Sequence, residues 1–97
     1  MQIVFVKKDS GPERLVCDAE IVFGDSGPLS GLKVVGFNLW RTADGDVSVT
    51  FPARAFGAGS DRRFFDYLRA TDGDAVAVKR LKAWIVEEYR RQAGAAA

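Results

Sequence analysis

Histidine is absent from the 97 residues of this chain. Histidine is the commonest general base and the commonest transition-metal ligand, so its absence argues against acid–base catalysis and metal binding. The single cysteine, Cys17, cannot form a disulfide within the chain, and no histidine is present to activate it as a nucleophile. We therefore expect a protein that is not an enzyme, with no catalytic residue, no metal and no cofactor.

Long apolar runs and a strong net charge are also lacking. No stretch approaches the roughly 18 apolar residues of a membrane span, and residues 1–11 lack the apolar core of a signal peptide. We expect a cytoplasmic protein with no membrane partner. Fourteen basic and thirteen acidic residues leave a net charge of +1, so any surface for a nucleic acid must be a local patch.

Four apolar runs separated by turn residues predict an antiparallel sheet. The length fits one domain, which we place at residues 1–93. Gly-Pro and Asp-Gly pairs between the runs are typical of hairpin turns, and Pro52 should end the last strand because proline has no amide hydrogen to donate. A fifth strand or a weakly paired extended segment is expected at 62–68. The four predicted strands lie at 1–8, 14–23, 32–41 and 47–51.

The alternation of side chains predicts which face of each strand is buried. In the second run, one face carries Leu15, Cys17, Ala19, Ile21 and Phe23, which is typical of a half-buried strand. In the third run, Val35, Phe37 and Leu39 share the face assigned to the core, and Gly36 permits a bulge or a close approach of another element. Trp40 lies on the opposite face with Val34 and Asn38, so it would be exposed unless a partner subunit covers it.

One amphipathic helix is predicted from about residue 72 to Gln92. Thr71 or Asp72 can cap its first amides, and Asp74 complements the positive end of its dipole. The weak stop at Gly94 predicts a frayed tail at 94–97. The fold class is therefore α+β, an antiparallel sheet of four to five strands with one C-terminal helix packed on it. The apolar stripe consists of Ala77, Val78, Leu81, Trp84, Ile85 and Tyr89.

Five short segments follow one another along the chain in a recognisable order and spacing. They are "AEIVF" at 19–23, "LKVVGFNLW" at 32–40, "DGDVSVTFPAR" at 44–54, "GSDRRFFD" at 59–66 and "LKAWIVEEYRR" at 81–91. In these segments the chain resembles, over almost its whole length, the bacterial SpoVG family of septation and sporulation regulators. The resemblance implies a small antiparallel sheet with a C-terminal helix, a homodimer formed through strands, and site-tolerant binding of DNA or RNA in gene regulation or septation.

Nine basic and six acidic residues lie between Arg54 and Arg91, so the second half of the chain is the more basic one. Arginine suits phosphate oxygens, and neighbouring phenylalanines can stack on unpaired bases. Alternatively, these arginines form salt bridges to Asp61 or Asp66, and the basic residues of the helix lie on a solvated face. The candidate nucleic-acid-binding residues are Arg54, Arg62, Arg63, Lys79, Arg80 and Lys82.

Aromatic residues near the basic ones allow a second interpretation. Phe64 and Phe65 fit a core or a dimer interface as well as a nucleic-acid surface, and we group them with Trp40 as a candidate dimer interface. The leading hypothesis is a weak nucleic-acid-binding homodimer with a regulatory role. The alternative is a protein–protein interaction module that binds a protein partner and no nucleic acid.

Overall fold

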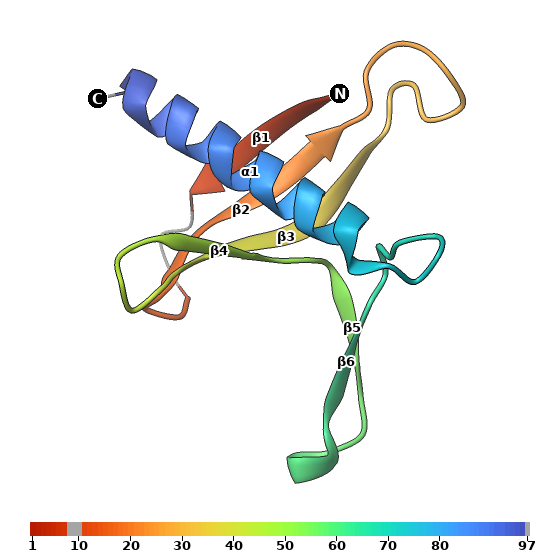
Figure 1. The fold of residues 1–97 in the computed structure, drawn as a ribbon, viewed down its shortest axis with the longest axis vertical. Helices are drawn as coiled ribbons and strands as arrows, with labels where there is room; N and C mark the ends of the chain where they lie inside the picture. The colour runs from red at the N-terminus through yellow and green to blue at the C-terminus, as the bar shows by residue number, and fades with distance from the viewer. Residues whose placement is uncertain (8–10, 97) are drawn as a thin grey trace.

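The computed structural model describes residues 1–7 and 11–96, and their side chains as far as residue 93. It confirms the α+β class: a four-stranded antiparallel sheet carries one C-terminal helix, and two further strands form a separate hairpin (Figure 1). The first predicted turn lies partly outside the described residues. The elements are β1 Gln2–Lys7, β2 Leu15–Val22, β3 Lys33–Arg41, β4 Val47–Thr50, β5 Ala53–Phe56, a 3-10 turn Gly59–Asp61, β6 Arg63–Asp66 and α1 Ala75–Ala96.

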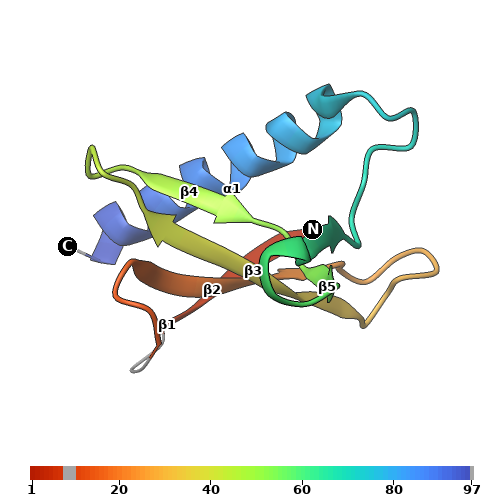
Figure 2. The ribbon, with the colours of Figure 1, turned by 90° about the horizontal axis from the view of Figure 1, so that it is seen from below.

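The sheet is a meander in the order β1-β2-β3-β4, so each strand pairs with its neighbour in the sequence. The helix α1 crosses one face of this sheet, and the opposite face, here called the outer face, carries no helix (Figures 1 and 2). The core therefore lies between α1 and the sheet, as the alternation from Cys17 to Phe23 predicts. Leu15 is an exception: a register shift pairs it with Trp40 of the outer face and Val16 packs against the core instead, so the prediction that Leu15 shares the core face is wrong. The buried members of the core are Ile3, Cys17, Ala19, Ile21, Phe37, Leu39, Val49, Phe51 and Ile85.

A β-bulge in β3 corrects one part of the predicted pattern. Ala19 pairs with Phe37 but Ile21 pairs with Val34, so β3 carries one residue more than β2 between the two pairs. The extra residue turns Val34 toward the core and leaves Val35 51% exposed. The prediction that Val35 shares the core face is wrong, because strict alternation does not continue through a bulge.

Gly36 makes this bulge possible for two reasons. Its φ of +105° is a backbone conformation that residues with a side chain rarely adopt. A Cβ atom at this position would also lie 2.9 Å from the Cβ of Pro52, closer than two carbon atoms can approach. Gly36 therefore serves both roles that the sequence predicts for it, a bulge and a close approach.

The helix α1 begins after Asp74. The Asp74 carboxylate accepts a hydrogen bond from the Val76 amide at 3.1 Å, and Asp72 accepts one from the Asp74 amide at 2.9 Å. The cap is therefore Asp74, which lies two residues after Asp72 and three after Thr71, so the prediction of Thr71 or Asp72 as the cap is wrong. The helix continues past Gln92 to Ala96 through most of the predicted frayed tail, and residue 97 lies outside the described residues.

Ile85 is the fully buried centre of the helix stripe. Val78, Leu81 and Trp84 pack against the same core, as the stripe predicts. Tyr89 meets Phe5 of β1 edge to face with 5.4 Å between ring centroids. Within the described residues, no helix is long and apolar enough to cross a membrane.

The hairpin of β5 and β6 leaves the sheet at Pro52 and projects away from both the sheet and the helix (Figure 1). The strand expected at 62–68 does form, as β6, but it pairs with β5 and does not extend the four-stranded sheet. Pro52 ends the sheet as predicted, since β4 stops at Thr50 and β5 begins at Ala53. All four residues of β6 are exposed.

Candidate nucleic-acid interface

The pairing of β5 with β6 sorts the hairpin side chains onto two faces. Residues directly opposite each other in an antiparallel pair share a face, and successive residues alternate between the faces. The register pairs Arg54 with Phe65 and Phe56 with Arg63 on one face, which we call the Arg–Phe face. The other face carries Ala53, Ala55, Phe64 and Asp66.

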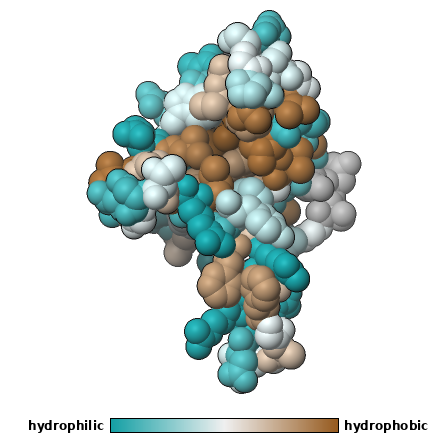
Figure 3. Space-filling model, turned by 90° about the vertical axis from the view of Figure 1, so that its right-hand side faces the viewer, coloured by the Kyte–Doolittle hydropathy of each residue, from teal (hydrophilic) through white to brown (hydrophobic). Residues whose placement is uncertain are grey.

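Rings and guanidinium groups lie close together on the Arg–Phe face. The Arg54 guanidinium lies 4.7 Å from the centroid of the Phe56 ring, which in turn meets Phe65 edge to face at 5.2 Å. All of these side chains are exposed. Figure 3 shows hydrophobic and hydrophilic residues side by side on the projecting hairpin. Such a surface offers phosphate donors and stacking rings side by side.

The three candidate arginines of this segment do not form one patch. Arg54 and Arg63 share the Arg–Phe face, whereas the Arg62 guanidinium lies 5.2 Å from the ring of Phe64, which belongs to the other face. Neighbouring residues on an extended chain point in opposite directions, which separates Arg62 from Arg63. Within residues 1–7 and 11–96, none of the three arginines forms an ion pair, so the alternative of salt bridges to Asp61 or Asp66 does not apply there.

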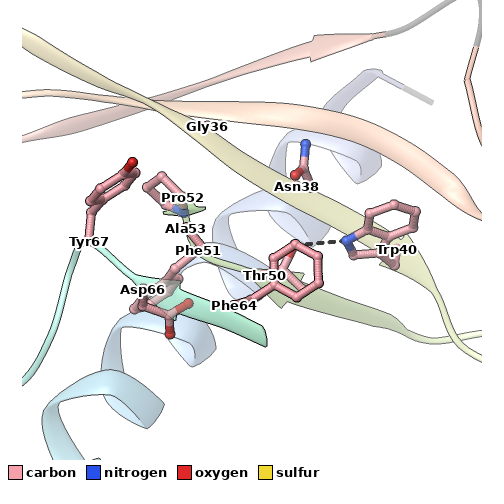
Figure 4. A pocket seen from close by; sticks show the side chains of 10 residues that line it. All are labelled: Gly36, Asn38, Trp40, Thr50, Phe51, Pro52, Ala53, Phe64, Asp66 and Tyr67. Atoms are coloured by element: carbon pink, nitrogen blue, oxygen red, sulfur yellow. Dashed lines mark hydrogen bonds between the residues drawn. The ribbon is translucent and has the colours of Figure 1, made fainter. Parts of the chain in front are cut away.

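A groove of about 590 Å³ lies between the hairpin and the outer face of the sheet (Figure 4). We call it the hairpin groove. Trp40 and Tyr67 lie at opposite ends of it in Figure 4, and Phe64 lies between them. The Trp40 indole donates a hydrogen bond to the Thr50 hydroxyl at 2.9 Å, which fixes the orientation of its ring.

The hairpin groove brings together two of the three candidate dimer-interface residues. Trp40 and Phe64 both line it, and Phe64 is 66% exposed. Trp40 lies on the outer face, as its strand position predicts, and is half-buried. Phe65 lies on the Arg–Phe face instead, so the structure separates it from the other two.

The three candidate basic residues of the helix, Lys79, Arg80 and Lys82, lie on two of its sides. Lys82 lines a groove with β4 and holds its ammonium 5.3 Å from the Phe51 ring, and Lys79 is one helical turn away on the same side. Arg80 lines a different groove, with Met1 and Trp84. These residues therefore do not act as one surface with the hairpin arginines.

Sequence reasoning missed the contribution of Arg90. Its guanidinium bonds the Asp46 carboxylate at 2.6 Å, which ties the end of α1 to the turn before β4. Hydrogen bonding by Arg90 lowers the pKa of Asp46 below its ordinary value. The spacing of Lys79, Lys82, Val86 and Arg90 at three and four residues is the signal that could have placed Arg90 beside the two lysines.

Cys17 is 4% exposed and packs in the core, as expected for a small apolar side chain. Burial, with a smaller effect of the Asp18 carboxylate, raises the pKa of its thiol. A raised pKa disfavours the reactive thiolate. In the part of the chain that is described, no three His, Cys, Asp or Glu residues are arranged to hold a metal ion.

Comparisons with known proteins identify no family for the chain. No protein-family model matches the chain, and neither the curated proteins nor the solved structures contain a match. The geometry of the exposed hairpin and the order of the sequence motifs therefore carry the functional argument.

Proposed function

We propose that the protein is a non-enzymatic bacterial regulator that binds DNA or RNA weakly, through the Arg–Phe face of its hairpin. The observation that carries this proposal is the arrangement of Arg54, Phe56, Arg63 and Phe65 on one exposed face, with a guanidinium 4.7 Å from one ring and the two rings 5.2 Å apart.

The chemistry of this face favours unpaired segments of the nucleic acid. A guanidinium group can bond two phosphate oxygens at once, and a base stacked on an exposed ring contributes about 1–3 kcal/mol. In a duplex the faces of the bases are covered, so the rings would add little there. Two arginines contact few phosphates, which predicts weak binding that falls as salt rises.

Fluorescence anisotropy with labelled single-stranded and double-stranded DNA and RNA, at two salt concentrations, tests the proposal. Single strands should bind more tightly than duplexes. The double variant Arg54→Ala with Arg63→Ala should reduce the slope of log affinity against log salt by about 1.4, since each phosphate contact to a single strand contributes about 0.7.

The matched control, Arg14→Ala with Arg91→Ala, removes the same charge outside the hairpin and should leave most of the binding intact. No binding at low salt, or equal losses in the two double variants, would contradict the proposal. A further double variant, Lys79→Ala with Arg80→Ala, measures how much the basic residues of the helix contribute to the affinity for the nucleic acid.

The resemblance to the SpoVG family supports a homodimer and a role in gene regulation or septation. A two-stranded hairpin alone is marginally stable in water, and this one exposes Phe64 and Tyr67 by 66% and 67%. Covering these rings and Trp40 with a second copy would remove that apolar surface from water. Light scattering should give twice the chain mass of 10.6 kDa, and Phe64→Ser should shift the equilibrium toward the monomer.

The hairpin groove also supports the second candidate function, a protein–protein interaction module. Its aromatic lining fits an apolar side chain of another protein, with no need for phosphate contacts. Recovery of one protein in stoichiometric amount, unchanged by nuclease and lost in Trp40→Ala, would favour this function. Loss of that partner after nuclease treatment would favour the nucleic acid.

A further inference from the structure

The strand β4 lies at the edge of the four-stranded sheet, so among the described residues no strand pairs with it on one side. The backbone amide of Thr42 donates a hydrogen bond to the Asp46 carbonyl at 2.9 Å, so this pair is of the hydrogen-bonded type. In an antiparallel ladder the two types alternate, so Val47 and Val49 turn their amide and carbonyl groups away from β3. The Val47 amide confirms this direction, because it donates to the Asp46 carboxylate at 2.8 Å.

Val49 is 5% exposed and lies beside a groove between β4 and α1, so neighbouring side chains must move aside before another chain can reach its backbone. This edge groove has a volume of about 430 Å³, and Val47 and Val49 line it from the strand. Ala83 and Val86 line it from the helix. No aromatic side chain is among its lining residues.

Two cations mark the ends of the edge groove. The Lys82 ammonium lies 5.3 Å from the Phe51 ring beyond one end of β4, and the Arg90 guanidinium bonds Asp46 beyond the other end. The helix therefore runs along β4, with these two residues about 12 Å apart along its axis. Lys79 extends the positive stripe, and neither lysine forms an ion pair among the described residues.

We propose that this edge binds an extended acidic peptide, which adds a fifth strand beside β4. Residues four apart on a strand are separated by about 13 Å, close to the 12 Å between Lys82 and Arg90. One carboxylate can meet the Lys82 ammonium, and a second at this spacing can bond the guanidinium N–H groups of Arg90 that are not used by Asp46. An aliphatic residue midway between the two carboxylates would pack on Val86. Hydrogen bonds between the peptide backbone and the backbone of Val49 would supply affinity, as in other proteins that bind a peptide by adding a strand to a sheet edge.

The charges argue against a second copy as the occupant. Pairing β4 with β4 of another molecule would bring two sets of Lys79, Lys82 and Arg90 together, and like charges repel. A nucleic acid would meet the cations, but it would find no ring to stack on and no partner for the strand backbone. The proposal does not depend on the Arg–Phe face, so either proposal can fail while the other stands.

The test uses the whole protein, labelled with ¹⁵N, and the peptide acetyl-Glu-Thr-Val-Thr-Glu-amide. Its two glutamates and its valine lie on one face of a strand. The matched control, acetyl-Gln-Thr-Val-Thr-Gln-amide, keeps the strand and removes both carboxylates. The acidic peptide should shift the amide signals of Val47–Thr50 and slow hydrogen exchange at Val49, with at least tenfold weaker binding of the control.

Protein variants separate this site from the hairpin. Lys79→Glu with Lys82→Glu should weaken the acidic peptide at least tenfold, whereas Arg54→Ala with Arg63→Ala should leave its affinity unchanged. The same acidic peptide, N-methylated on the edge that would pair with β4, should bind more weakly. If it binds with the same affinity as the unmethylated peptide, the proposed strand addition is wrong. The proposal would also fail if a thymidine octamer shifted the same edge signals in the Arg54→Ala, Arg63→Ala variant, or if Val49 became protected by raising the protein concentration alone.

Discussion

Two phenylalanines on strands of the same chain have opposite environments. Phe37 on β3 is completely buried beneath α1, whereas Phe64 on β6 is 66% exposed. Both residues lie within β-strands, where aromatic side chains are favoured. The difference arises because β3 has a helix on one side, while the hairpin of β5 and β6 has no second layer.

This comparison shows what an apolar strand residue contributes in each region. In the body of the sheet and α1, apolar side chains exclude water from one core and stabilise the fold. On the hairpin, the same side chains leave their area in contact with water, where a base, a partner protein or a second copy can cover it. Substitutions in the two regions should therefore change different properties.

The largest difference in the free energy of unfolding is expected between Phe37→Ala and Phe64→Ala. Removing the buried ring of Phe37 should lower the free energy of unfolding by about 3–5 kcal/mol, because it leaves a cavity in the core. Removing the exposed ring of Phe64 should change it by no more than about 0.5 kcal/mol. Urea unfolding followed by circular dichroism, at a protein concentration low enough to keep the chain monomeric, measures both. Equal losses would show that the hairpin is part of the cooperative core.

A smaller difference in the free energy of unfolding is expected between Gly36→Ala and Gly59→Ala. Gly36→Ala should destabilise the fold by about 1–3 kcal/mol, because it strains a φ of +105° and forces a Cβ against Pro52. Gly59 at the hairpin tip also has a positive φ, +60°, but a Cβ there would meet nothing within 4 Å. Gly59→Ala should therefore cost less than Gly36→Ala in the same urea experiment. The reverse order would mean that Pro52 moves away easily.

The helix cap should show an effect of about 1 kcal/mol. Asp74→Ala removes the carboxylate that bonds the Val76 amide, and the loss of such a cap destabilises a helix by about that amount. Asp72→Ala, which removes an acceptor from the preceding turn, is the matched control and should have the smaller effect. If Asp72→Ala has the larger effect, the capping assignment is incorrect.

Local signals in the sequence account for most of the fold. Gly-Pro and Asp-Gly turns, alternating strands and the helical stripe act between residues near each other, so the meander and α1 could be predicted. The bulge could be predicted at Gly36, but its effect on Val34 and Val35 could not, since the direction of the shift depends on the pairing with Ile21. The pairing of β6 with β5 was missed, because nothing local distinguishes it from a fifth strand of the sheet.

The candidate site was less predictable than the fold. The adjacent arginines Arg62 and Arg63 had to lie on opposite faces of any strand, which alternation alone could have indicated. That Arg63 shares a face with Arg54 depends on the register of the hairpin, which its turn sets. The partnership of Arg90 with Asp46 spans half the chain, so it required the packing of α1 along β4.

The smallest effect concerns that ion pair, in which both side chains are more than half exposed. The lowered pKa of Asp46 means that the pair stabilises the fold above the ordinary aspartate pKa, and that this stabilisation is lost as pH falls through the lowered value. In Arg90→Gln, the pKa of Asp46 should rise toward the ordinary aspartate value, as followed by carboxyl NMR during an acid titration. Asp44 is an internal control, because the Thr42 hydroxyl is the main cause of its own lowered pKa. A rise at both carboxylates would indicate that the turn itself had opened, and an unchanged Asp46 would show that Arg90 does not contact it in solution.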